Sequence, residues 1–161
     1  AEVLPSLTGL THLSLIATGL YDGEGLYQLC ASLGALPRLT TLEMGFNKLG
    51  DGVSYVASAL PTLTSLTHLD LTHLDAPFSR GGLMADGAGC LAAALPTCPT
   101  LTRVYAPHNF MGSSGVEAMV RSAQLCPALQ VLDLRGNRYG RSAHDVTVTE
   151  LVEKSRMRII L

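Results

Sequence analysis

Histidine and aspartate side chains that could ligate a metal ion lie close together in the middle of this sequence. His68, Asp70 and His73 fall within one short stretch, and His108 follows further along the chain. Imidazole nitrogens and carboxylate oxygens are ligands that Zn²⁺ accepts. If these residues stand on neighbouring strands, however, the strands are about 4.8 Å apart, and His68 and His73 need not converge on one ion. We therefore expect neither a metal nor a cofactor.

Motifs for nucleophilic or phosphate chemistry are missing from the sequence. Ser113 and Ser114 lack the G-x-S-x-G context of an activated serine, and no phosphate-binding glycine loop, HExxH or CxxC motif occurs. Asp70 and Asp133 are separated by a stretch that contains Tyr105, so a close pair of carboxylates is not expected. We predict that the chain is not an enzyme.

A leucine frame, L-x-x-L-x-L-x-x-N, recurs five times and determines where these side chains stand. Its first leucines are Leu10, Leu39, Leu66, Leu101 and Leu129, at intervals of 29, 27, 35 and 28 residues. We number the nine positions of the frame as places 1 to 9. The alternation of apolar and polar residues in the first half of each unit predicts a short strand whose alternate side chains are buried.

The ninth place of the frame carries asparagine in three of the five units. An asparagine there can satisfy backbone groups where the chain leaves the strand. Thr18 stands at this place in the first unit, and its hydroxyl can also bond to the backbone. Leu74 stands there in the third unit, and its side chain cannot. The three asparagines are Asn47, Asn109 and Asn137.

The second half of each unit predicts a helix antiparallel to the strand. A glycine and two apolar residues recur at a spacing of four, which puts them on one helical face. Pro5, Pro37, Pro61 and Pro96 are expected to end four of these helices, because proline cannot continue a helix. Units of this length predict an α/β leucine-rich-repeat solenoid, a curved horseshoe segment with parallel strands on its concave face and helices on its convex face. The helical positions are Gly25, Leu29 and Leu33; Gly52, Val56 and Leu60; Gly87, Leu91 and Leu95; and Gly115, Met119 and Ala123.

The unit length of about 28 residues and the G-x-x-x-L-x-x-x-L helix resemble the ribonuclease-inhibitor-like class of leucine-rich repeats. That class also includes the sensor arrays of NOD-like receptors, the Ran GTPase-activating protein and the tropomodulin cap domain. The resemblance covers almost the whole chain, and it implies a non-catalytic scaffold that binds another protein. The alternative, by analogy with the Ran-type repeats, is a regulator of an enzyme in trans, such as a GTPase activator.

The composition argues against a nucleic-acid ligand and against a membrane-spanning segment. Charged residues make up 15% of the 161 residues and the net charge is −2, whereas nucleic-acid binding needs clustered Lys and Arg. No apolar run approaches the roughly 20 residues of a membrane span. We therefore expect the partner to be another protein.

The four cysteines have a structural explanation in this frame. Cys98 and Cys126 stand three residues before a first leucine, where the other units have Leu7, Leu36 and Leu63, so cysteine is expected to act as a small buried hydrophobe. Cys30 and Cys90 fall within the predicted helices. We expect all four to be reduced and structural, which favours a cytoplasmic protein.

The outward places 3, 5, 7 and 8 are expected to form the concave face and to bind the partner. Aromatic and arginine side chains are enriched at interfaces, and four of the five histidines also stand on or beside this face. The plain alternative is a solvated face that is polar only because it is exposed. The predicted binding residues of the repeat units are His12, Glu43, Phe46, His68, Asp70, His73, Arg103, Tyr105, His108, Phe110, Asp133 and Arg135.

The third unit is about seven residues longer than its neighbours, because its interval is 35 residues rather than 28. The extra residues lie within Asp75–Gly82, just after Leu74. Insertions in solenoids map to loops on one rim, often the binding side, and Phe78 and Arg80 are the residues there with the reach to bind a partner. The alternative is a tolerated surface insertion, because long loops cost little entropy.

Both ends of the sequence suggest that residues 1–161 form one array with a partial unit at each end. We expect this array to belong to a longer solenoid. Ala1–Leu10 align with Ala57–Leu66, the last helical turn of a unit, and the final MRIIL predicts a sixth strand. Ser142 and Asp145 resemble a capping box. Terminal repeats usually need a polar cap, which the first residues do not provide. Val148, Leu151 and Val152 suit a closing helix.

Overall fold

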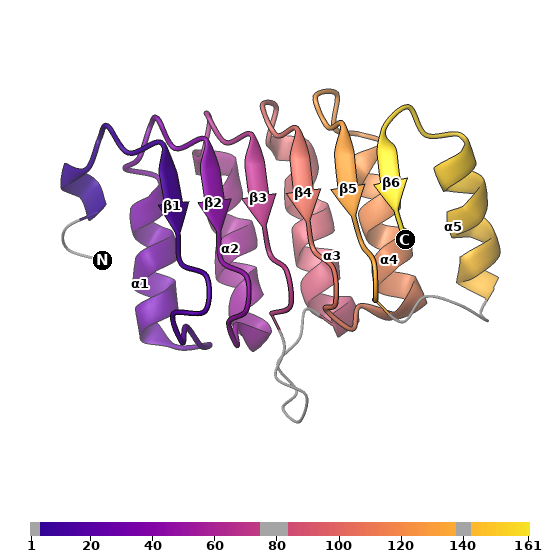
Figure 1. The fold of residues 1–161 in the computed structure, drawn as a ribbon, viewed down its shortest axis with the longest axis horizontal. Coiled ribbons are helices and arrows are strands. Elements are labelled where there is room, and N and C mark those ends of the chain that lie inside the picture. The colour runs from indigo at the N-terminus through magenta and orange to yellow at the C-terminus, as the bar shows by residue number, and fades with distance from the viewer. Residues whose placement is uncertain (1–3, 75–83, 138–142) are drawn as a thin grey trace.

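The computed structural model describes residues 4–74, 84–137 and 143–161. Its strands form one sheet in which every strand pairs in parallel with the next along the chain. Figure 1 shows the strands side by side, with the helices in a second layer behind them. The predicted parallel sheet with helices on its other face is confirmed, and so is the sixth strand. The strands are β1 (His12–Ser14), β2 (Thr41–Glu43), β3 (His68–Asp70), β4 (Arg103–Tyr105), β5 (Val131–Asp133) and β6 (Arg158–Ile160).

One helix follows each of the first five strands and returns the chain to the start of the next strand. The predicted closing helix is present, and its Val148 is fully buried. Ser142 of the predicted capping box lies outside the described residues. The helices are α1 (Glu24–Leu33), α2 (Val53–Ala59), α3 (Met84–Ala94), α4 (Gly112–Ala123) and α5 (Ala143–Glu153).

Proline does not end α2 and α3 as abruptly as predicted. Pro61 lies inside the 3₁₀ turn Leu60–Thr62, and Pro96 lies inside Leu95–Thr97, so each helix tightens into a further turn before it stops. Proline fits the first positions of such a turn because its fixed φ suits the turn and its missing N–H needs no partner there. In the first unit α1 ends at Leu33, before Pro37 is reached.

The core lies between the two layers and is made by places 1, 4 and 6. In the second unit Leu39, Leu42 and Met44 have no exposed surface, while their strand neighbours Thr41 and Glu43 are half-buried. The period-two burial is therefore the predicted one. Burying a leucine of this kind contributes about 2 kcal/mol, so these repeated positions account for much of the stability of the fold.

Three of the four cysteines are buried in this core and one is not. All four are free thiols, and Cys30, Cys98 and Cys126 are buried as expected, whereas Cys90 is exposed. The prediction that all four are structural is therefore wrong for Cys90, which lies on the outer side of α3. Burial raises the pKa of the Cys30 thiol to about 11, so this thiol stays protonated at neutral pH.

Buried side-chain amides tie each unit to the one before it. The amide nitrogen of Asn47 donates to the carbonyl of Leu15 in the first unit (2.7 Å) and to that of Met44 in its own (2.8 Å). Asn137 makes the same pair of hydrogen bonds to Ala106 and Leu134, at 2.9 and 2.7 Å. A buried donor and acceptor left without a partner would be costly. The asparagine at place 9 therefore fixes how closely consecutive units stack.

The two departures from asparagine behave differently. The hydroxyl of Thr18 donates to the Leu15 carbonyl at 2.8 Å, so the predicted substitution of threonine is confirmed. Leu74 has no exposed surface and belongs to the apolar core. Its backbone N–H is instead satisfied by the side-chain oxygen of Asn109 from the next unit, at 2.7 Å. At place 9 the third unit therefore has a buried leucine side chain instead of an amide that hydrogen-bonds to the second unit.

A second ladder of hydrogen bonds runs through place 2. The hydroxyl of Thr40 donates to the carbonyl of Thr11 (2.9 Å), and that of Thr67 donates to the carbonyl of Thr40 (3.1 Å). Thr102 continues the series to Thr67 at 2.9 Å. Because each bond joins one unit to the one before it, the threonines hold the starts of neighbouring strands in register.

Replacing Asn109 by alanine tests how much the amide ties contribute. We expect Asn109→Ala to lower the free energy of unfolding by about 3 kcal/mol, because the Leu71 carbonyl and the Leu74 N–H lose their buried partner. Thr18→Val, which removes an exposed hydrogen bond, is the control and should cost under about 1 kcal/mol. Urea unfolding followed by circular dichroism measures both, and equal losses would contradict the interpretation.

Candidate functional site

The side chains at the outward places stand in columns on one face of the sheet, which we call the sheet face. The parallel register sets His12, Thr41, His68, Arg103 and Val131 side by side at place 3. The same register forms the place-5 column. Because successive residues of a strand point to opposite sides, these side chains point away from the helices. The place-5 column is Ser14, Glu43, Asp70, Tyr105 and Asp133.

Three aromatic rings lie in a row where the chain leaves strands β2, β3 and β4, and the first two are stacked. The rings of Phe46 and His73 are nearly parallel, with centroids 5.4 Å apart and planes at 17°. His108 continues the series, 6.2 Å from His73. Phe46 is 57% exposed and His108 is also exposed. We call these three residues the ring column.

The backbone under the ring column is left-handed, with φ of 59° at Phe46, 51° at His73 and 58° at His108. Ala17 and Gly136 occupy the same place 8 with φ of 53° and 69°, so every unit makes this turn whatever its side chain. The left-handed conformation costs a residue with a Cβ roughly 1–2 kcal/mol. The fold therefore needs the turn, but not the rings.

Gly136 ends the ring column for a steric reason. A Cβ at this position would clash with the imidazole ring of His108, which lies over the glycine backbone. The positive φ of 69° is also one that glycine adopts without cost. The fifth unit therefore supports the ring of the fourth and adds none of its own.

The sheet brings other predicted residues together in pairs. His68 and Tyr105 lie on neighbouring strands with ring centroids 5.1 Å apart. His12 Nε2 is 3.3 Å from Glu43 Oε2. Asp70 accepts a hydrogen bond from the Thr72 backbone N–H at 2.8 Å. Histidines and carboxylates are thus dispersed into separate contacts across the face.

This dispersal bears on the metal hypothesis. His68 is engaged with Tyr105 on β4, whereas His73 stacks on Phe46 and meets His108 at a tilt of 51°. Within residues 4–74, 84–137 and 143–161, no group of three or more His, Cys, Asp or Glu side chains is placed to hold a metal ion.

Asp133 is on the sheet face but is not open to a partner. Its side chain is 1% exposed, and Arg135 covers it with Nη2 2.6 Å from Oδ2 and Nε 3.0 Å from Oδ1. Burial raises the pKa of this carboxyl, but the hydrogen bonds and charge of Arg135 outweigh burial and leave the pKa below its usual value. Of the pair, only the exposed Arg135 is available to a partner, and Asp133 orients it.

The remaining predicted residues are only partly placed. Arg103 is exposed on β4, and Phe110 is half-buried with a φ of 54° just after the ring column. Phe78 and Arg80 of the predicted 75–82 loop lie outside the described residues.

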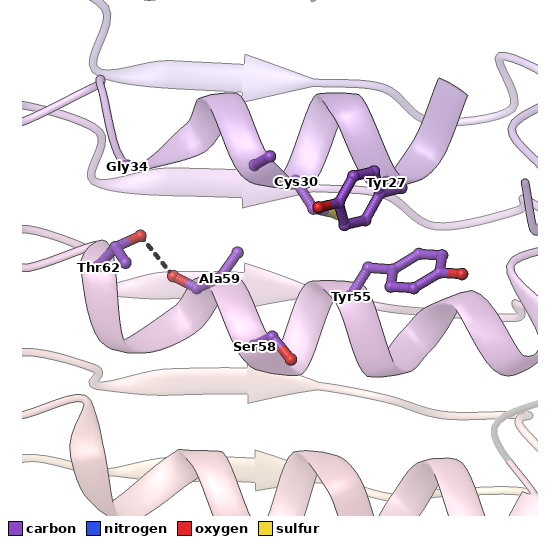
Figure 2. A pocket seen from close by; sticks show the side chains of 8 residues that line it. Tyr27, Cys30, Gly34, Tyr55, Ser58, Ala59 and Thr62 are labelled. Atoms are coloured by element: carbon purple, nitrogen blue, oxygen red, sulfur yellow. Dashed lines mark hydrogen bonds between the residues drawn. The ribbon is translucent and has the colours of Figure 1, made fainter. Parts of the chain in front are cut away.

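A groove on the helix side was not expected from the sequence. It has a volume of about 220 Å³ and lies between α1 and α2. Figure 2 shows Tyr27 and Cys30 of α1 facing Tyr55 of α2 across it, and the two tyrosine rings pack edge to face at 5.5 Å. Small residues at Ala31 and Gly34 leave the space open. The run of small residues in α1 was the available signal.

The groove offers little chemistry. Its one thiol, Cys30, is kept protonated by burial, with its pKa raised to about 11. The Thr62 hydroxyl is already used by the carbonyl of Ala59 at 2.7 Å. We therefore regard the sheet face as the candidate site. Nor does any helix in the described parts of the chain have the length and apolar character to cross a membrane.

Replacing Arg135 by glutamine tests its role over Asp133. A carboxyl with a lowered pKa in the folded state contributes stability above its unfolded pKa and loses it as the pH falls through the folded pKa. Without the guanidinium, Asp133 loses the largest of the contacts that lower its pKa and contributes less stability above its unfolded pKa, so on acidification Arg135→Gln should begin to unfold at a higher pH than the wild type. In the Asp133→Asn background the same change should not move the midpoint. Circular dichroism against pH measures it, and an unshifted midpoint in Arg135→Gln would be inconsistent with the pairing.

Known proteins resemble this chain in fold but not detectably in sequence. No protein-family model and no curated protein matches the sequence. Among solved structures, Leiomodin-1 Actin-Binding Site 2 is similar, with a TM-score of 0.69 and 16% identity over 95% of this chain and 85% of that chain. TLR13 in its ssRNA13 complex has a TM-score of 0.52 and 14% identity over 96% of this chain, which spans only 22% of TLR13. Both neighbours are of the leucine-rich-repeat type, and at such identities they establish the fold alone. The chain folds as an α/β leucine-rich-repeat solenoid.

Proposed function

We propose that the chain is a non-catalytic scaffold that binds a protein partner through its sheet face. The observation that carries this proposal is the ring column of Phe46, His73 and His108. Three consecutive units place a ring on a left-handed backbone, although Ala17 and Gly136 show that the turn forms without one. Two of these rings, Phe46 and His108, are exposed and His73 is half-buried; rings prearranged in this way lose little side-chain entropy on binding and offer a large apolar area.

Charged side chains share the sheet face with the ring column. Arg103 and Arg135 are exposed on the units of β4 and β5, and Arg135 is held in place by Asp133. Glu43 and Asp70 stand half-buried on β2 and β3. Aromatic rings together with arginines and carboxylates on one face form the composition of a protein interface. With a net charge of −2 and both signs on this face, a protein suits it better than a polyanion such as a nucleic acid.

The two structural neighbours are compatible with this proposal without identifying a partner. The Leiomodin-1 structure is that of an actin-binding site, whereas TLR13 was solved in complex with ssRNA. The two ligands differ in kind, so the shared fold does not determine the ligand. The proposal for this chain therefore rests on its own residues.

Three finer predictions belong to the same proposal. The 75–82 loop, with Phe78 and Arg80, would add to the binding surface because it follows His73 and Leu74 directly in the chain. Membership of the ribonuclease-inhibitor-like class is supported by one strand and one helix per unit. A cytoplasmic location is supported by four free cysteines, of which three are buried.

Removing the rings tests the binding face. We expect Phe46→Ala and His73→Ala each to weaken partner binding about tenfold, the loss typical of one interface anchor, and to leave the melting temperature almost unchanged because the rings lie outside the core. Tyr27→Ala removes an exposed aromatic ring from the helix side (49% exposed, against 57% for Phe46) and is the control. Affinity purification with quantitative mass spectrometry compares the three. The proposal fails if no protein bound by wild type and Tyr27→Ala is depleted from both ring variants.

A further inference from the structure

The first unit is packed less completely than the others, although it has the same residue types. Leu10 and Leu13, at places 1 and 4, remain partly exposed, whereas Leu39 and Leu42 at the same places have no exposed surface. The leucines or valine at place 4 of the third to fifth units are also fully buried. In the described sheet β1 pairs only with β2, so the other side of the first unit has no neighbouring strand. We call this side, formed by β1 and α1, the β1 edge.

The helices show the same difference at the glycine of the helical pattern. A Cβ added at Gly52 would meet Leu26 and Asp22 of the preceding unit, and one added at Gly115 would meet Ala88 of its preceding unit at 3.0 Å. A Cβ added at Gly25 meets nothing within 4 Å. Glycine at this position thus lets the preceding unit approach closely. At Gly25 the corresponding space holds no atoms of another unit.

The residues before β1 repeat the comparison. The 3₁₀ turn Leu4–Ser6 matches Leu60–Thr62 in kind and in distance from the following strand. Leu63 after the second turn is 3% exposed, whereas Leu7 after the first is 42% exposed. The turn is therefore formed, but no strand–helix layer of the described chain covers its leucine.

The backbone of β1 also carries hydrogen-bonding groups directed toward this edge. The backbone N–H groups at place 3 donate hydrogen bonds to the preceding unit. The N–H of Thr41 donates to the carbonyl of Thr11 at 3.0 Å, and the N–H of His68 donates to the carbonyl of Thr40 at 3.0 Å. Place-5 carbonyls accept from the preceding unit, as Glu43 does from Leu15 at 2.8 Å. By the same geometry the N–H of His12 and the carbonyl of Ser14 point away from β2. Such an edge is a template for another strand.

We propose that the β1 edge binds one further strand–helix unit of this repeat type, with its strand parallel to β1 and its helix packed on α1 over Gly25. The occupant is identified by comparison with the later units. There the preceding unit buries the leucines at places 1 and 4, packs closely against the helix glycine and bonds to the strand backbone in parallel. This surface lies at the end of the sheet and α1, apart from the ring column. Its test is therefore independent of the proposed function.

The experiment supplies such a unit from the chain itself. Residues 35–56, which hold β2 and the start of α2, are fused directly before Ala1, because Ala1–Leu10 align with Ala57–Leu66. We expect the fusion to melt roughly 5 °C or more above the parent chain, since burying several leucines adds the few kcal/mol that such a shift requires. A fusion with the same 22 residues in scrambled order is the control and should melt with the parent.

A glycine substitution then locates the contact. Gly25→Met should not lower the melting temperature of the parent chain and should raise it by a few °C at most, because nothing lies near that position and glycine is a poor helix former. In the fusion it should remove most of the gain, because the added helix then occupies that space. Equal melting of the native-order and scrambled fusions overturns the proposal, as does a fusion that tolerates Gly25→Met.

Self-association is the remaining outcome to distinguish. Sedimentation of the parent chain over a range of concentrations should show a monomer whose mass Leu13→Lys does not change. If the parent instead forms dimers or longer assemblies and Leu13→Lys abolishes them, the β1 edge binds a second copy and the proposal is overturned. Head-to-tail contacts between copies would then build open filaments rather than closed pairs.

Discussion

Hydrogen bonds from buried asparagine amides to the unit before them set the distance between repeats, and the rest of the molecule depends on that distance. The amide of Asn47 spans from Met44 to Leu15, and Asn137 repeats the bridge between the last two complete units. With strands of only three residues, the sheet alone would fix the register weakly. The asparagine amides at place 9 and the threonines at place 2 fix it in the units that carry them, and the outward columns then follow.

The repeat frame was sufficient to predict the architecture because it encodes the core directly. Leucines at places 1, 4 and 6 can only be buried together if the units stack in parallel, and the sheet order follows from that. Thr18 was also predictable, since a hydroxyl reaches the same carbonyl as an amide. The role of Leu74 was not, because only the structure shows that Asn109 of the next unit satisfies its N–H.

The candidate site was predicted in its residues but not in its geometry. Place numbers put Phe46, His73 and His108 in one column, yet nothing in the frame reveals a left-handed backbone or the stacking that it produces. Asp133 was the opposite case. It occupies an outward place, but the ion pair with Arg135 and its burial make it a support rather than a contact. The sequence shows that Asp133 is a carboxylate. Whether the side chain of Arg135 covers it depends on the rotamers of the two residues, which the sequence does not show.

The leucine at place 9 of the third unit has a consequence for how the array loses its structure. In a solenoid each unit interacts only with its neighbours, so cooperativity is transmitted from one interface to the next. Leu74 contributes burial at its interface with the second unit but no amide bridge to the Met44 carbonyl. That interface therefore lacks the buried side-chain amide that Asn47, Asn109 and Asn137 provide at the interfaces with their preceding units, so no such amide has to break when the second and third units separate. The stacked contact between Phe46 and His73 joins the same two units.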